Sequence, residues 1–167
     1  VYLSWAEAGA DGISAVVGRA KLRLDGRPRL QGLSIIWRQH EKSSGRGHFG
    51  HRIAFGSDGK LYLSSGERQR FEPAQDMASN LGKIVRLNDD GTIPRDNPFA
   101  GKGGVSAQIW SLGHRNPLGL AFDGAGRLWT SEMGPKGGDE LNLAVRGGNF
   151  GYPKVSNGDH YDGRTIP

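Results

Sequence analysis

Residues 53–67, IAFGSDGKLYLSSGE, decide the fold because the same pattern returns later in the chain. Residues 120–134, LAFDGAGRLWTSEMG, match them position by position, with Phe55 opposite Phe122 and Leu61 opposite Leu128. In both copies an alternating apolar run, a glycine turn and a second apolar run follow one another, which is the pattern of a β-hairpin. The opening VYLSW fits the second half of the same unit, so three copies are visible, the first of them truncated.

Further strands are expected at residues 15–24, 33–38, 83–87, 108–111 and 141–145, and a short helix only at residues 73–81. Repeated sheets of about four strands with long loops between them favour a β-propeller over a sandwich. We therefore expect an all-β chain that forms a single partial propeller domain over residues 1–167, with roughly half of the blades and incomplete at both ends. Val1 already lies in a strand-like run, which indicates a piece cut from a longer protein. As a free chain it would expose unpaired sheet edges and be unstable or self-associating.

The composition excludes several classes of protein. The 167 residues are 35% hydrophobic and include 28 glycines, which predicts a folded chain with many tight turns. The net charge is +5, but the basic residues are dispersed and no aromatic-interleaved motif accompanies them, so nucleic acid is not an expected partner. The absence of cysteine excludes disulfides and thiolate metal sites. No apolar run approaches the roughly 20 residues of a membrane span.

Two polar, glycine-rich stretches precede equivalent strands of successive repeats. They are residues 47–52, GHFGHR, and residues 113–117, GHRNP. Equivalent loops of neighbouring blades point to the same face of a propeller, where ligand sites form. The sequence therefore predicts that both stretches contribute to one site.

These stretches carry a resemblance to a known family. The chain resembles the soluble pyrroloquinoline-quinone (PQQ) dependent sugar dehydrogenases, the glucose and aldose dehydrogenase family with a six-bladed propeller. The matching segments are GHFGHRIAFGSDGKLYLSSGE, LGKIVRLNDDGTIPRDNPF, LGHRNPLGLAF, SEMGPKGGDELNL and GGNFGYP. They follow the family order and span residues 47–153, about two thirds of the chain. Five ordered segments are far more specific than a lone GHRNP.

The resemblance implies a catalytic base and a carboxylate beside it. Oxidising a sugar hydroxyl requires a base for the hydroxyl proton while hydride leaves the carbon, and a neutral imidazole suits that role. His48 matches the family's base. Glu67 stands where the family usually has Asp, and a carboxylate there would fix the tautomer of the imidazole. His51 replaces the usual Gly of this motif, and its role is left open.

The cofactor of the family is a tricarboxylate, which needs cations and planar donors. Arg115 and Asn116 match family positions that contact PQQ, and the guanidinium of an arginine can grip a carboxylate or a quinone oxygen. Pro117 would stiffen the loop that presents them. For His114 a purely structural role in the loop remains an equal alternative.

The resemblance also implies calcium, which binds six to eight oxygen ligands including main-chain carbonyls. The carbonyls of Gly134 and Pro135 match those that hold the ion at the cofactor. A second calcium site would use Glu140 and the carbonyl of Phe150. For Asp139 a structural role in the loop is the preferred reading.

The function implied by the resemblance is oxidation of the anomeric hydroxyl of aldoses to lactones, with hydride transfer to PQQ and electrons passed to an external acceptor. The complete protein would be periplasmic or secreted and possibly a homodimer, and the isolated chain is expected to be inactive. Two alternatives remain open at this point: a propeller binding module without redox chemistry, and a calcium-dependent propeller lactonase. Failure to bind PQQ would favour the first, and lactone hydrolysis without PQQ the second.

Overall fold

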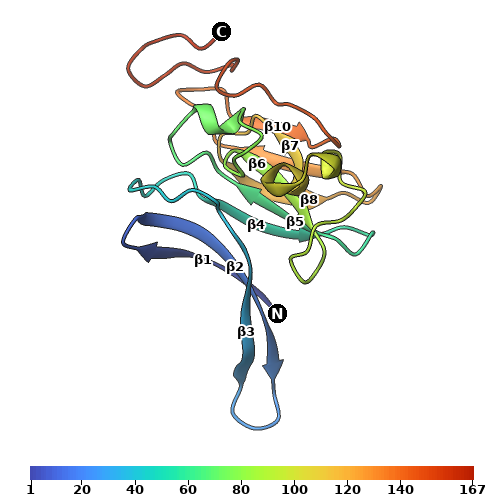
Figure 1. The fold of residues 1–167 in the computed structure, drawn as a ribbon. Helices are drawn as coiled ribbons and strands as arrows, with labels where there is room; N and C mark the ends of the chain where they lie inside the picture. The colour runs from blue at the N-terminus through green and yellow to red at the C-terminus, as the bar shows by residue number, and fades with distance from the viewer.

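The computed structural model describes residues 1–167 and contains ten strands in three antiparallel sheets (Figure 1). The first sheet is formed by β1 (Tyr2–Gly9), β2 (Gly12–Arg23) and β3 (Arg29–Arg38). The second has the order β4 (Gly50–Phe55), β5 (Leu61–Ser65), β6 (Lys83–Leu87) and β7 (Ile109–Leu112). The third consists of β8 (Pro117–Phe122), β9 (Leu128–Glu132) and β10 (Glu140–Leu143). The predicted all-β class is therefore confirmed, and the three sheets form part of a propeller.

The repeated segments form equivalent hairpins, as the sequence predicts. β4 pairs with β5 so that Phe55 lies opposite Leu61, and β8 pairs with β9 so that Phe122 lies opposite Leu128. Gly59 has a positive φ of 71° in the first turn, a conformation that L side chains rarely adopt. In each hairpin, the start of the first strand and the last residue of the second strand lie at the same end of the sheet. That end carries the loops singled out above.

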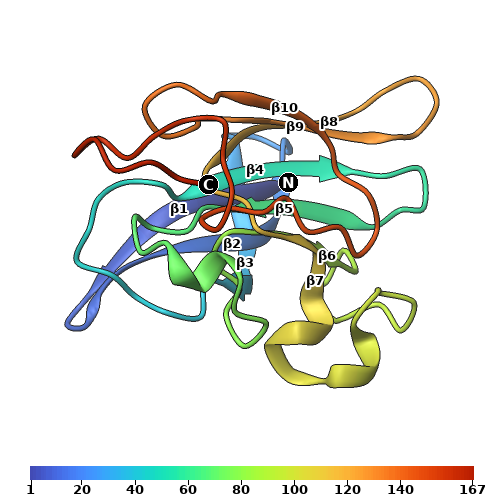
Figure 2. The same ribbon diagram turned by 90° about the horizontal axis from the view of Figure 1, so that it is seen from above.

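The sheets lie beside one another in layers (Figure 2). Apolar side chains pack between them. Leu61 and Leu63 of β5 point toward the first sheet, where they meet Trp37, whereas Tyr62 points toward Leu128 of the third sheet. Because β5 is covered on both faces, all of its side chains are buried, including those of Ser64 and Ser65. Apolar burial at these two interfaces is the main stabilising contribution of the described residues.

The helix expected at residues 73–81 is wrong: the structure has only a 3₁₀ turn, η1 (Glu72–Ala74). A helix would use the carbonyls of Pro73 and Ala74 for bonds along its axis. Instead, the buried ammonium of Lys83 donates to both, at 2.7 and 3.0 Å, and to Leu81 O at 2.7 Å. Leaving a buried ammonium without acceptors would cost more free energy than losing the last turn of a solvent-exposed helix. Burial lowers the pKa of Lys83 to about 7, and the negative charges of Asp76 and Glu41 act in the opposite direction.

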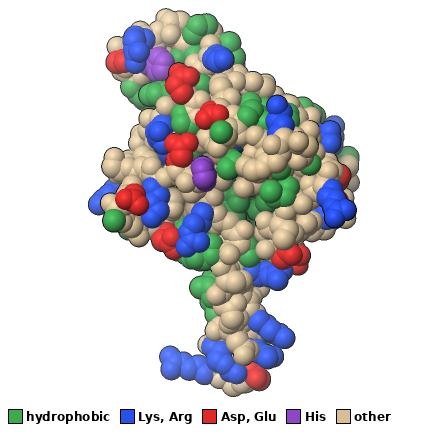
Figure 3. All heavy atoms as spheres, in the orientation of Figure 1, with side chains coloured by type: hydrophobic (Ala, Val, Ile, Leu, Met, Phe, Trp, Pro, Cys, Tyr) green, Lys and Arg blue, Asp and Glu red, His purple; other side chains and the backbone are tan.

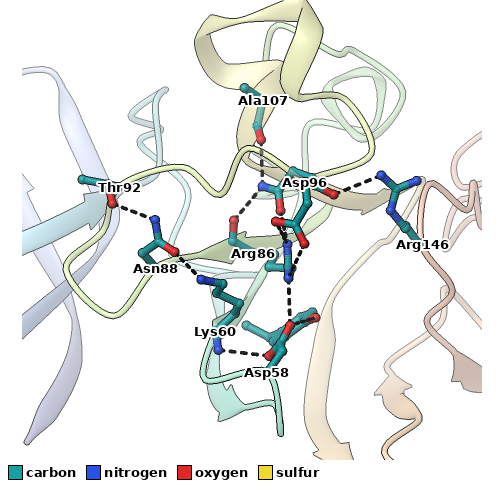
Figure 4. A network of polar contacts seen from close by, with 10 residues as sticks. Asp58, Lys60, Arg86, Asn88, Thr92, Asp96, Ala107 and Arg146 are labelled. Carbon is teal, nitrogen blue, oxygen red and sulfur yellow. Dashed lines mark hydrogen bonds and ion pairs between the residues drawn. The ribbon is translucent and has the colours of Figure 1, made fainter.

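The segment between β6 and β7 contains two 3₁₀ helices, η2 (Ala100–Lys102) and η3 (Gly104–Gln108), and is held by Arg86 (Figure 4). The guanidinium lies 2.8 Å from Asp58 Oδ2 and 2.9 Å from Asp96 Oδ1. Asn97 donates to Ala107 O at 2.8 Å. Asp58 lies in the β4–β5 turn, so this network stabilises the end of the sheet that is opposite the polar loops.

β2 and β3 extend beyond the packed sheets as a long hairpin (Figure 1), and its tip is rich in Lys and Arg (Figure 3). Leu24 at the tip is 69% exposed, so this end of the hairpin is solvated. No helix of the structure is long and apolar enough to cross a membrane.

Candidate functional site

His48 and Glu67 lie side by side although 19 residues separate them. His48 precedes β4 and Glu67 follows β5, and the antiparallel pairing of these strands brings both to one end of the sheet. His48 Nδ1 is hydrogen-bonded to Glu67 Oε1. Glu67 is wholly buried, and its Oε2 accepts the Phe71 N–H at 2.8 Å. The extra methylene of Glu relative to Asp therefore does not prevent the pairing.

The other ring nitrogen of His48, Nε2, has no hydrogen-bond partner in the protein, and the residue lines a cavity of about 440 Å³. Because a carboxylate only accepts hydrogen bonds, the proton on a neutral His48 ring belongs on Nδ1, toward Glu67. The lone pair of Nε2 is then free to accept a proton from a molecule in the cavity.

The cavity collects several of the predicted site residues. Its volume falls within the range of about 300 to 1,000 Å³ that is usual for small-molecule sites. Its walls mix aromatic, cationic and acidic side chains: His48, Glu67, Gln69, Phe71, Arg115, Met133, Pro135, Tyr152, His160, Tyr161, Asp162 and Arg164. Asn116 and Gly134 are buried but are not among the lining residues.

Strained backbone is concentrated at this cavity. His48, Gln69 and Phe71 line it and have positive φ angles of 52°, 59° and 61°. Arg68, between two of the lining residues, has a φ of 61°. Such conformations cost about 1 to 3 kcal/mol each and persist where the surroundings enforce them, typically at functional sites.

Arg68 holds the loop that carries His48. Its guanidinium is buried and donates to Gly47 O at 2.9 Å, to Ile13 O at 2.7 Å and to Gly45 O. It also lies 3.7 Å from the centre of the Phe49 ring. Arg68 thus connects the first sheet with the main chain directly before His48 and with the ring of Phe49 directly after it. Burial lowers the pKa of this guanidinium from its usual high value.

Arg115 is fixed at the cavity wall by its neighbours. Its Nη1 donates to Met133 O at 2.8 Å and to Gly134 O at 2.6 Å. Its Nε is buried without a hydrogen-bond partner, and so is Asn116 Oδ1. A buried polar atom without a partner is uncommon and marks a place where a ligand or water atom belongs.

Asn116 packs against Gly66, at the back of the His48 loop. A Cβ added to Gly66 would lie 2.1 Å from His48 O and 2.9 Å from Asn116 Oδ1, so only glycine fits there. The close approach of these three residues sets the distance between the β4 and β8 loops.

The loop after β9 presents main-chain carbonyls. Asp139 Oδ1 accepts the Gly134 N–H at 2.9 Å and closes the loop, as the structural reading of Asp139 predicts. A Cβ at Gly134 would lie 2.2 Å from Gly138 O. No group of three or more His, Cys, Asp or Glu side chains gathers around one point in the structure. A calcium ion in this loop would therefore depend on carbonyl oxygens, which are ordinary ligands for it.

Glu140 and Phe150 lie on a separate cavity of about 350 Å³. Burial raises the pKa of Glu140, although the nearby Asn142 Nδ2 donates to its Oε2 at 2.7 Å. The structure thus brings together the two residues named for a second metal site.

The sequence reasoning missed a second His–Glu pair, in the third sheet. His114 Nδ1 is hydrogen-bonded to Glu132 Oε1, and its Nε2 lies 2.8 Å from Ser111 Oγ. The ring stacks on Phe150 with the centroids 4.6 Å apart, and it is fully buried. His114 precedes β8 and Glu132 ends β9, so this pair also lies at the end of its sheet that carries the polar loops. The two pairs are not equivalent in the repeat, because Glu132 aligns with Ser65 and His114 with Gly47. Aligning the hairpins could therefore not have found the second pair, which depends on the pairing of β8 with β9.

His51 differs from these paired histidines. Its φ is 73°, in the left-handed region that favours glycine. Its Nε2 is buried without a partner, and its ring meets the edge of Phe49 at 5.3 Å. Burial, followed by the charges of Arg68 and Arg52, lowers the pKa of His51 to about 4.

The chain is similar to known proteins. The model of the Glucose / Sorbosone dehydrogenase family matches residues 1–167. The aldose sugar dehydrogenase YliI of Escherichia coli (strain K12) is 41% identical over 169 residues, which cover 100% of this chain and 45% of that protein. The quinoprotein glucose dehydrogenase B of Acinetobacter calcoaceticus is 42% identical over 132 residues, 68% of this chain and 27% of that protein.

Solved structures agree with these relatives. The apo-form of the soluble aldose sugar dehydrogenase from Escherichia coli matches with a TM-score of 0.88 at 40% identity, over 99% of this chain and 48% of that one. The PQQ-bound form of the aldose sugar dehydrogenase from Streptomyces coelicolor matches with a TM-score of 0.77 at 33% identity, over the same shares of 99% and 48%. The chain thus spans about half the length of these relatives or less. The family resemblance drawn from the sequence is confirmed.

Proposed function

The chain belongs to the Glucose / Sorbosone dehydrogenase family, and on that premise we propose that it is about half of a six-bladed, PQQ- and calcium-dependent sugar dehydrogenase. Residues 1–167 would form one continuous part of the propeller domain. The reaction is oxidation of the anomeric hydroxyl of an aldose to a lactone. Support comes from relatives described as aldose sugar and quinoprotein glucose dehydrogenases, one of them in a PQQ-bound form.

One observation carries the proposal: His48 Nε2 faces the cavity without a protein partner while Nδ1 is held by a buried carboxylate. This is the geometry of a general base. His48 removes the proton of the sugar hydroxyl as the hydride leaves the same carbon. Glu67 keeps the ring in the tautomer that exposes the Nε2 lone pair, and it stabilises the imidazolium after proton uptake.

The residues present fit PQQ. The cavity combines a cationic group, Arg115, with aromatic side chains at Phe71 and Tyr152, and a planar tricarboxylate needs both. Arg115 Nε and Asn116 Oδ1 are buried polar atoms that lack partners. We assign Arg115 and Asn116 to holding the cofactor. When bound, PQQ supplies the two-electron acceptor for the hydride. Burial raises the pKa of Tyr152 to about 12, so its hydroxyl stays protonated as a donor in the cavity wall.

Calcium at the cofactor would be held by the carbonyls of Gly134 and Pro135, and a second ion by Glu140 and the carbonyl of Phe150. Gly134 O already accepts a hydrogen bond from the Arg115 guanidinium, so this carbonyl faces a positive charge in the structure. A bound calcium ion would polarise the oxygens it touches. An external acceptor, a periplasmic or secreted location and a possible homodimer complete the proposal by analogy with the family.

The test is dye reduction by the full-length protein with aldoses, leaving out PQQ and calcium in turn, beside a His48→Ala variant. We expect activity that requires both additions and is lost in the variant. Absence of PQQ binding and turnover would make the chain part of a binding propeller. Hydrolysis of lactones without PQQ would instead make the protein a lactonase.

A further inference from the structure

The buried pair His114–Glu132 does not face the cavity that contains His48, so it needs a separate explanation. Ser111, His114 and Glu132 form a hydrogen-bonded chain that resembles a serine hydrolase triad. Ser111 and His114 are fully inaccessible, however, and Glu132 is only 5% exposed, so no substrate reaches the serine. The role of these three side chains therefore lies in the residues that they hold in place.

Glu132 reaches Arg115 with its second oxygen. Oε2 accepts the Arg115 N–H at 2.9 Å, while Oε1 binds His114. On the other side, Arg115 O accepts the Glu67 N–H at 2.9 Å. The main chain of Arg115 is therefore clamped between the carboxylate of one His–Glu pair and the amide of the other.

The side chain of Arg115 ends in the same region. Its guanidinium binds the carbonyls of Met133 and Gly134, which directly follow Glu132 in the chain. Glu132 thus fixes both the start of the Arg115 side chain and the segment against which it ends. Ser111 in turn fixes the outer nitrogen of His114, so the ring cannot turn away from Glu132.

We propose that Ser111, His114 and Glu132 are positioning residues that hold Arg115 at the cavity wall and, through the Arg115 carbonyl, keep Glu67 in register with it. This inference rests on the proposed function, since it takes Arg115 as the residue that holds PQQ. The chain therefore has two His–Glu pairs with separate roles. One faces the reacting group, and the other supports the residue that binds the cofactor.

The experiment is a PQQ titration of the full-length apo-protein, followed by tryptophan fluorescence, together with its apo melting temperature. Glu132→Met removes the acceptor for the Arg115 N–H, and we expect PQQ to bind about 10-fold or more weakly. Glu132→Gln keeps an oxygen for that N–H and can donate to His114 in its other tautomer, so PQQ affinity should return to within about 3-fold of wild type.

Val17→Ala, in the core between the first two sheets, is the matched control. It should lower the melting temperature without changing PQQ affinity. Equal PQQ affinity in Glu132→Met and wild type overturns the inference, and so does a loss that Glu132→Gln does not rescue. If Glu132→Met does not fold, Ser111→Ala takes its place, with an expected loss of about 2- to 5-fold in affinity and overturn if affinity is unchanged. Failure of the wild type itself to bind PQQ overturns the proposed function instead.

Discussion

The two His–Glu pairs of this chain are built alike but differ in what surrounds the outer nitrogen of the histidine. In the second sheet, His48 Nε2 faces a cavity with no protein partner. In the third, His114 Nε2 is bound by Ser111, and the ring is covered by Phe150. Both pairs lie at the same end of their sheets, because each histidine precedes the first strand of a hairpin and each glutamate lies at or just beyond the end of the second strand. They do not occupy equivalent positions of the repeat.

The comparison of the two pairs shows that the surroundings of a His–Glu pair decide its role. The same hydrogen bond from Nδ1 to a glutamate orients both rings. Only His48 combines that bond with access to a ligand. His114 instead makes two internal bonds and contributes to the arrangement of Arg115.

The largest effect is expected from exchanging the histidines one at a time for glutamine in the full-length protein. His48→Gln removes the base and should lower kcat for aldose oxidation about 1,000-fold, with a nearly unchanged melting temperature. His114→Gln should lower the melting temperature and weaken PQQ binding, because it disturbs the buried network behind Arg115, but it should leave kcat at saturating PQQ nearly unchanged. Steady-state dye reduction and thermal unfolding followed by circular dichroism separate the two. Equal loss of kcat in both variants would break the distinction between the pairs.

Arg68 provides a second test of the difference between the pairs, because its buried guanidinium supports the loop that carries His48. Arg68→Met should lower the free energy of unfolding by about 2 to 3 kcal/mol, since the carbonyls of Gly45, Gly47 and Ile13 lose their donor. Arg68→Lys should recover only part of this, because an ammonium lacks the wide planar fork of a guanidinium. Urea unfolding of the full-length protein measures both. A fully stable Arg68→Met variant would contradict the assigned role.

Glu67 tests how much the carboxylate adds to the base. Glu67→Gln keeps the shape but loses the charge that stabilises an imidazolium, and we expect kcat to fall about 10- to 100-fold. Glu67→Asp keeps the charge on a shorter side chain and should fall less. Rates are compared at saturating sugar and PQQ. A Glu67→Asp variant slower than Glu67→Gln would show that reach matters more than charge.

The smallest effect concerns His51, which is unpaired. Its pKa is lowered to about 4 in the folded protein against about 6.5 for an unperturbed histidine, so between these values the unfolded state binds more protons. The contribution of a neutral His51 is complete above pH 6.5 and is lost as the pH falls toward 4. His51→Asn, which tolerates the positive φ, should make the melting temperature less steep in pH over this window. Parallel curves for the two proteins would exclude the effect.

Much of the architecture could be predicted from local sequence. Alternation and turn glycines identified the strands, and residues 83–87 were predicted with the bounds that the structure has for β6. The expected helix at residues 73–81 failed because Lys83, beyond that segment, takes up its carbonyls. Local periodicity carries no information about a competing donor of this kind.

The candidate site, too, could be predicted only in part from the sequence. Family motifs predicted that His48, Glu67, Arg115 and Pro135 belong to one site, and all four line one cavity. The sequence left open whether Glu67 reaches His48 and what His114 does. Both answers depend on the side chains that fill the space between neighbouring sheets.

By itself, the sequence determined the strand pattern, the repeated hairpin and the residue types available for chemistry, because these follow from side-chain alternation and turn conformations close together in the chain. Only the tertiary structure decided which histidine lines a cavity, which is fully buried, and which carbonyls Arg68 and Lys83 bind. The reason is physical. Burial and hydrogen-bond partners are properties of the packed sheets, and they join residues that lie far apart in sequence.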